Sequence, residues 1–129
     1  MRYTLAPFLA GLTAALVLCG CGQNKASLKA DALELEKAFN LKPGVTPADD
    51  RSPAALAAKA VAAIRARDWP NAVSTLTRLR TAKGLTAHQS EVVHNANGNA
   101  YVQLAEMARK GNQDARATLE MLKKAASAR

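Results

Sequence analysis

Hydrophobic residues divide the chain into one unbroken apolar run and five stretches with helical spacing. The run covers residues 5–18 and contains no charged side chain. Beyond it, apolar residues recur every three or four positions, which places them on one face of a helix. The first of these stripes consists of Leu28, Ala32, Leu35 and Phe39. It predicts a helix from Leu28 to about Asn40, with Ser27 as its cap.

Four further helices are predicted from residues that can cap a helix start. Side-chain oxygens of Ser, Thr, Asp and Asn accept hydrogen bonds from the free amides of a first turn. Such residues precede the later stripes at Ser52, Asp68, Thr86 and Asn112. Pro53 and Pro70 are tolerated because a first-turn proline loses no hydrogen bond, and Gln89 completes a capping box with Thr86. These helices are predicted to end near residues 67, 83, 110 and 126, with Lys83-Gly84 as one of the stops.

The stripes of these four helices are the predicted core of an all-α fold. In chain order they are Leu56, Ala60, Ala63 and Ile64; Trp69, Val73, Leu76 and Leu79; Val93, Ala96, Ala100, Leu104 and Met107; and Ala115, Leu119 and Leu122. One predicted helix has a weak stretch, because Asn95, Asn97, Gly98 and Asn99 are poor helix formers. Either the helix is weak there or a close contact requires the small Gly98.

A segment rich in turn-forming residues separates the first helix from the rest. Residues 40–52 include Pro43, Gly44 and Pro47, so we interpret them as a linker. The first helix is therefore predicted to be a separate stalk rather than part of the core. This divides the chain into a signal at 1–20, an anchoring segment at 21–52 and a helical-hairpin domain at 53–129.

The beginning of the chain has the features of an export signal. Arg2 supplies a positive start, and the apolar run is shorter than the roughly 20 residues that cross a bilayer. Leu18-Cys19-Gly20-Cys21 resembles the lipobox of bacterial lipoproteins, which implies cleavage after Gly20 and lipidation of Cys21. Cys19 is a poor alternative because bulky Leu18 would then stand at the cleavage position. An ordinary cleaved signal with an incidental cysteine is the other interpretation.

Lipidation of Cys21 would place the protein in the cell envelope. Two or more acyl chains anchor a protein stably without a spanning helix. The anchor would lie on the outer face of the cytoplasmic membrane or, in a cell with two membranes, in the outer membrane, since Gly22 rather than Asp follows it. Residues 22–52 would hold the helical domain off this membrane. Cys19 would leave with the signal, so no internal disulfide could form.

The charge balance favours anionic partners. The chain has 18 Lys and Arg against 10 Asp and Glu, a formal net charge of +8. Lipid head groups, acidic envelope polymers or an acidic protein face would suit it, whereas nucleic acid is not expected in this compartment. Solubility alone is the simpler explanation. The basic residues that could contact an anionic surface are Arg65, Arg67, Arg78, Arg80 and Lys83.

Two of the predicted helices begin alike at an offset of 43 residues. With this offset Ala72 falls on Ala115, and Leu76 falls on Leu119. A fixed period of this size indicates stacked helical hairpins. The residues expected to pack them are Trp69, Ala72, Leu76, Ala115 and Leu119. Two unrelated amphipathic hairpins in an alanine-rich chain are the alternative.

Asp68-Trp69-Pro70-Asn71-Ala72-Val73 resembles the start of the second helix of a tetratricopeptide repeat. The resemblance covers about residues 53–83, with a weaker copy at 87–126. It implies antiparallel helical hairpins that bind peptides or proteins in a groove. The period of about 43 departs from the family's period of about 34, and two units are fewer than the three that usually bury a continuous core. Self-association, or the first helix packed over one end, would complete the stack.

No residue pattern predicts catalysis, and we expect no enzyme and no cofactor. The serines lack a nucleophile-elbow context. The cluster His88, Glu91 and His94 resembles a metal site, but its two histidines point about 120° apart around a helix and cannot share an ion. A metal or ligand carrier is a remote alternative. We expect a membrane-anchored interaction or scaffolding module, or else a structural protein whose basic helices bind anionic lipid or cell-wall polymer.

Overall fold

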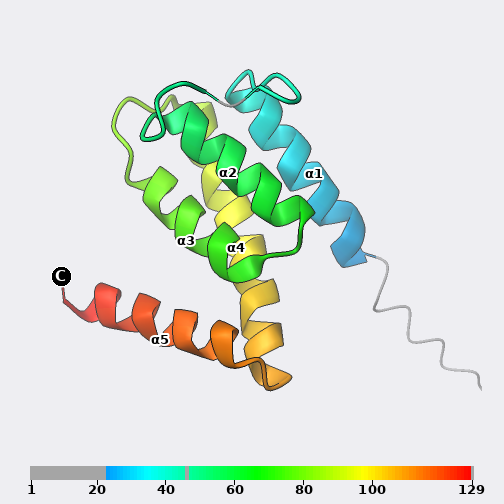
Figure 1. The fold of residues 1–129 in the computed structure, drawn as a ribbon, viewed down its shortest axis with the longest axis vertical. Helices are drawn as coiled ribbons and strands as arrows, with labels where there is room; N and C mark the ends of the chain where they lie inside the picture. The colour runs from blue at the N-terminus through cyan, green and yellow to red at the C-terminus, as the bar shows by residue number, and fades with distance from the viewer. Residues whose placement is uncertain (1–22, 46, 129) are drawn as a thin grey trace, which may run out of the picture.

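Five helices and no strand make up the part of the chain that the computed structural model describes, residues 23–45 and 47–128. The helices are α1 (Gln23–Ala38), α2 (Pro53–Arg65), α3 (Trp69–Arg80), α4 (Ala87–Arg109) and α5 (Gln113–Ser127). The first four pack as a bundle in which the long α4 contacts both α1 and α3, while α5 extends across one end (Figure 1). The prediction of an all-α fold is confirmed.

The predicted caps form at all four later helices. The caps and the residues whose amides donate to them are Ser52 with Ala55, Asp68 with Asn71, Thr86 with Gln89, and Asn112 with Ala115. The side chain of Gln89 also accepts from the amide of Thr86 at 3.0 Å, which completes the capping box. Each cap contributes about 1 kcal/mol by satisfying a free amide. These helices therefore begin where the sequence predicts.

The core is built from the predicted stripes, and it includes α1. Ala32 and Leu35 of α1, and Phe39 just after it, are buried in the same cluster as the apolar residues of α2, α3 and α4. The prediction of a separate first helix is therefore wrong. Closing a connection the length of residues 40–52 costs little free energy, whereas burying large apolar side chains contributes about 1.5–3 kcal/mol each.

Two hydrogen bonds between α1 and α4 add to this packing. Asn99 Nδ2 donates to Asp31 Oδ2 at 2.9 Å, and Gln89 Nε2 donates to the carbonyl of Ala38 at 3.0 Å. Both bonds join residues more than 50 positions apart in the chain. They hold α1 in one register along α4.

The predicted start of the first helix and the predicted end of the third helix are wrong. α1 begins at Gln23, so Ser27 is not its cap and lies inside the helix. α3 ends at Arg80, before the expected stop at Lys83-Gly84. The hydroxyl of Thr81 donates to a carbonyl of the last turn at 2.9 Å, and this bond closes the helix early.

The α2–α3 and α4–α5 turns share one backbone geometry. Each has a left-handed residue just after the helix, Arg67 with φ +55° and Gly111 with φ +98°. The next amides, of Asp68 and Asn112, donate to carbonyls one turn back at 2.9 and 3.1 Å. These are Schellman motifs, which satisfy the last free carbonyls of a helix. In both turns the cap of the following helix comes directly afterwards.

The two hairpins nevertheless differ beyond their turns. Equivalent turn residues, such as Asp68 and Asn112, are 44 positions apart, whereas the apolar pattern repeats at an offset of 43. One residue corresponds to a rotation of about 100° around a helix. Leu76 is fully buried on α3, but Leu119 is only partly buried on α5. The second hairpin therefore does not repeat the packing of the first.

Beyond its first two turns, α5 has no fully buried residue. Ala115 and Thr118 are its buried residues, Leu119 and Leu122 are partly buried, and Met121 is 64% exposed. Figure 1 shows α5 leaving the end of α4 and diverging from α3. Its apolar stripe therefore extends beyond the core that covers it.

Candidate functional site

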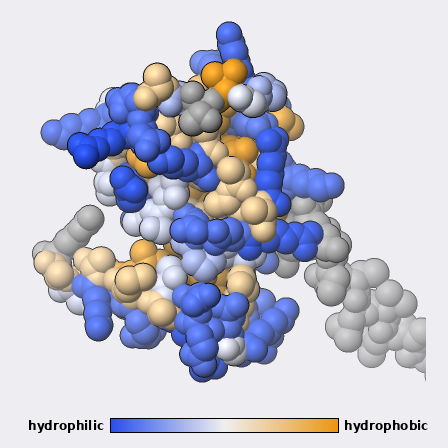
Figure 2. All heavy atoms as spheres, in the orientation of Figure 1, coloured by the Kyte–Doolittle hydropathy of each residue, from blue (hydrophilic) through white to orange (hydrophobic). Residues whose placement is uncertain are grey.

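A groove lies where α5 diverges from the bundle. We call it the α5 groove; its volume is about 390 Å³. Its lining is Thr77, Arg80 and Thr81 from α3 and its end, His94, Asn97, Gly98 and Tyr101 from α4, and Leu122, Ala125 and Ala126 from α5. Figure 2 shows the hollow between α5 and the body of the molecule, with pale and orange atoms along the side of α5 that faces it.

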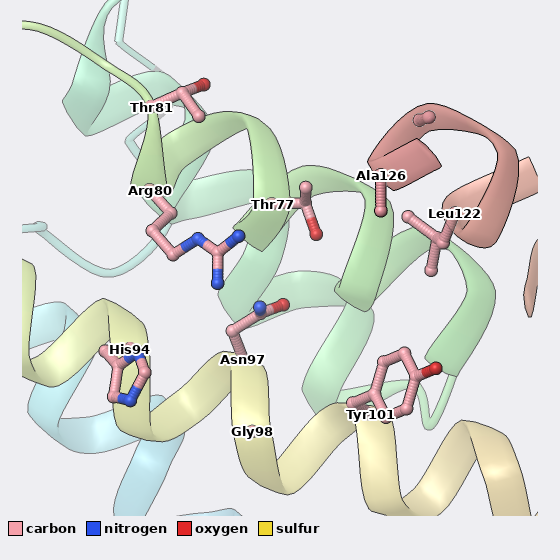
Figure 3. Close-up of a pocket in the computed structure, with 10 residues that line it drawn as sticks. Thr77, Arg80, Thr81, His94, Asn97, Gly98, Tyr101, Leu122 and Ala126 are labelled. Carbon is pink, nitrogen blue, oxygen red and sulfur yellow. The ribbon is translucent and has the colours of Figure 1, made fainter. Parts of the chain in front are cut away.

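The α5 groove has one apolar wall and one polar wall. Leu122 and Ala126 face it from α5, while Arg80 approaches from α3 and Tyr101 from α4 (Figure 3). Arg80 is exposed and forms no ion pair with the described residues. None of the described residues that line the groove is acidic. This combination favours an occupant with both apolar and anionic groups.

Asn97 lines the α5 groove and has one unsatisfied polar atom. Its Oδ1 is buried and has no hydrogen-bond partner within the described chain. An unpaired buried acceptor costs about 1–3 kcal/mol. The amide of Asn97 is therefore incompletely hydrogen-bonded at the wall of the groove.

Gly98 widens the α5 groove instead of making a close contact. A Cβ built at Gly98 meets nothing within 4 Å, so the expected tight packing is absent. α4 also runs unbroken through the Asn-rich stretch, from Ala87 to Arg109. The fold therefore does not require a glycine at position 98. Because Gly98 has no side chain, it leaves free space on the face of α4 that borders the groove.

The suspected metal cluster is divided between two cavities. His94 lines the α5 groove, whereas His88 and Glu91 face Asp31 and Glu34 of α1 in a smaller cavity of about 230 Å³. Among the residues that the structure describes, no group of three or more His, Cys, Asp or Glu could hold a metal ion. The rotation around α4 separates the histidines as their spacing predicts.

The five basic residues singled out from the sequence fall into two groups. Arg65 and Arg67 lie at the α2–α3 turn, where Arg65 pairs with Glu36 of α1 at 2.8 Å. Arg78, Arg80 and Lys83 lie at or beyond the other end of α3, a helix of 12 residues. Such a helix is about 18 Å long, so the five do not form one surface.

The residues of the expected lipid anchor, Gly20 and Cys21, lie outside the described residues. In the described part, no helix has both the length and the apolarity to cross a bilayer. The residues expected to pack the hairpins do lie in the core, with Leu119 at its edge. Trp69, Ala72, Leu76 and Ala115 are buried.

No family model, curated protein or solved structure matches the chain. Its function is therefore inferred from the α5 groove and from the residues that surround Cys21.

Several groove residues have no sequence signal of their own. Thr77 and Tyr101 look like ordinary polar and aromatic positions on amphipathic helices. The signal that was present is the Asn97-Gly98 pair, because small and polar residues within a long helix indicate a face that core packing does not fill. The Asn97-Gly98 pair therefore indicates one wall of the groove, but not the walls formed by α3 and α5.

Proposed function

We propose that this protein is a lipid-anchored interaction module of the cell envelope, and that the α5 groove is its binding surface. The anchor is Cys21, within the lipobox-like sequence Leu18-Cys19-Gly20-Cys21. The observation that carries the proposal is the partly covered apolar stripe of α5, which faces the cationic side chain of Arg80 across the groove.

The position of α1 supports a binding role close to the membrane. α1 begins two residues after Cys21 and packs into the core through Ala32 and Leu35. In this proposal the lipid anchor is therefore joined closely to a core helix. A module held in this way presents its groove at a defined distance from the lipid.

The occupant of the α5 groove is an acidic amphipathic helix from a partner protein. A helix that lies beside α5 covers Leu122 and Ala126 with its apolar face, as in other helix-in-groove complexes. Its carboxylates meet Arg80 on one side and the exposed Lys123 on the other. In this form the α2–α3 and α4–α5 hairpins act as a short tetratricopeptide-like stack that the partner's helix completes.

Site-specific photocrosslinking in the native membrane tests this proposal. A photoreactive residue at Gly98 of the full chain projects into free space in the groove. The matched control places the same residue at Val102, which is 61% exposed on α4 and does not line the groove. We expect one discrete product from position 98, with an acidic amphipathic segment at the crosslink, and loss of that product in Arg80→Glu. Crosslinks to lipid or to a second copy, or equal products from both positions, would contradict it.

A further inference from the structure

A second cavity opens beside the first turns of α1. We call it the α1 pocket; its volume is about 550 Å³. Its walls are mostly apolar and include Leu28, Leu33, Ile64 and Trp69. Leu33 is 47% exposed at its mouth, whereas Trp69 is 5% exposed. Figure 1 shows the beginning of α1 beside the turn between α2 and α3.

The rim of the α1 pocket is cationic. Lys29, Arg65 and Arg67 line it, all three are exposed, and none of the described lining residues is acidic. Arg65 is paired with Glu36, but Lys29 and Arg67 form no ion pair with the described residues. Two cations beside an apolar cavity are suited to an anion that is attached to an apolar group.

Arg67 occupies a backbone position that glycine fills more easily. Its φ of +55° is in the left-handed region, and Gly111 occupies the equivalent position of the other hairpin turn. Left-handed backbone is unfavourable for residues with a Cβ. The chain therefore carries a strained arginine where glycine would fit, and its guanidinium lies at the rim of the pocket.

The α1 pocket lies at the anchored end of the molecule. This step rests on the proposed function, in which Cys21 carries the lipid. Gly22 alone separates Cys21 from Gln23, and these two steps along the chain span at most about 7 Å. Lys29 is a further 9 Å or so along α1. The pocket therefore lies close to the lipid head groups in this proposal.

We propose that the α1 pocket binds the head group of an anionic phospholipid. Lys29 and Arg67 contact its phosphate, and Leu28 and Leu33 pack against its glycerol and first acyl carbons. This contact and the anchor at Cys21 together fix the orientation of the protein on the membrane. The α5 groove, bordered by the other end of α3, is then left free for its partner.

Trp69 provides a native reporter, since it is the single tryptophan of the chain and lines the α1 pocket. The full chain, purified from membranes in detergent, is reconstituted into phosphatidylcholine vesicles with or without phosphatidylglycerol, using lipids brominated on the acyl chains. We expect bromine quenching of Trp69 to increase at least twofold with phosphatidylglycerol and to fall again at high salt. Equal quenching in both vesicles would overturn the proposal.

Two charge-reversal variants separate this site from general basicity. Lys29→Glu with Arg67→Glu should reduce quenching to the level in phosphatidylcholine. Arg78→Glu with Lys83→Glu makes the same change of charge at the far end of α3 and should leave quenching as it was. If both pairs have the same effect, the α1 pocket is not the site. Arg67→Gly removes one cation without straining the fold, and it should lower quenching while the protein stays folded.

Two further measurements identify the source of the phosphate and isolate the anchor. Millimolar inorganic phosphate should not relieve the quenching; if it does, the pocket binds free phosphate and the lipid proposal fails. Flotation of the vesicles in high salt reports on the anchor alone. A protein that floats but shows no lipid-dependent quenching refutes the pocket, whereas one that does not float refutes the anchor at Cys21.

Discussion

Asn99 on α4 donates a hydrogen bond of 2.9 Å to the carboxylate of Asp31 on α1, across 68 positions of sequence. The bond joins the helix that follows Cys21 to the longest helix of the described fold. It also satisfies a carboxylate that is partly withdrawn from water. α1 is therefore held against α4 by a hydrogen bond at Asp31, and the chain around its end packs into the core through the apolar side chains of Leu35 and Phe39.

Asp31 should make stability depend on pH. Burial raises the pKa of Asp31, and the hydrogen bond from Asn99 lowers it by less. Because the folded pKa lies above the unfolded one, this contribution to stability is present at low pH and lost as pH rises through the folded pKa. Asp31→Asn keeps an acceptor for Asn99 and removes the charge. Urea unfolding should show a gain below about 1 kcal/mol at pH 7, since the site is partly exposed.

The gain from Asp31→Asn should disappear near pH 3.5, below the ordinary pKa of 3.8. A loss of stability in Asp31→Asn at pH 7 would mean that the ionised carboxylate is favoured by the fold.

Truncation of α1 side chains tests whether this helix belongs to the core. Leu35→Ala removes a fully buried side chain and should lower the free energy of unfolding by about 2–5 kcal/mol. Leu33→Ala, on the same helix but 47% exposed, should change it by less than about 0.5 kcal/mol. Urea denaturation followed by circular dichroism gives both values. Equal small effects would restore the interpretation of α1 as a separate stalk.

The left-handed turn residues should respond in opposite ways to substitution. Arg67→Gly should stabilise the fold by about 1 kcal/mol, because glycine adopts φ of +55° without strain. Gly111→Ala should destabilise it by about 1–2 kcal/mol for the same reason. Thermal unfolding measures both changes. A destabilised Arg67→Gly would show that the arginine side chain stabilises the fold more than its backbone strain costs.

Gly98→Ala tests the free space on α4. A Cβ at Gly98 meets nothing within 4 Å, and alanine is favoured over glycine inside a helix by about 1 kcal/mol. The variant should therefore gain up to that amount in thermal unfolding. A loss of more than about 1 kcal/mol would indicate a close contact at this face.

The sequence predicted the helices better than their arrangement. The starts at Ser52, Asp68, Thr86 and Asn112 followed from local chemistry, because a cap and the amide it accepts from lie three residues apart. The attachment of α1 could not be found in this way. The bond between Asn99 and Asp31 links residues that no local pattern connects, and a proline-containing segment says nothing about whether its two ends pack together.

The α5 groove could not be predicted from the repeat, because the apolar pattern and the helix caps repeat at offsets that differ by one residue. The apolar pattern aligns Leu76 with Leu119, which predicts two similar hairpins, but the caps of α3 and α5 align at Asp68 and Asn112. This shift rotates the apolar stripe of α5 by about 100° around the helix relative to that of α3, and Leu119 and Leu122 are only partly buried. The apolar pattern predicts which face of a helix is apolar. How that face is placed against the other helices also depends on where the preceding turn starts the helix.

Both proposals require the lipid on Cys21, and the mass of the N-terminal peptide of the protein purified from its membrane tests this most directly. Trypsin should release residues 21–25, ending at Lys25. We predict that this peptide begins at Cys21 and carries a diacylglyceryl group and an acylated amine. Cys21→Ser should abolish the modified peptide and Cys19→Ser should not. A chain that begins at Met1, or a peptide in which Cys21 has a free thiol, would contradict the account.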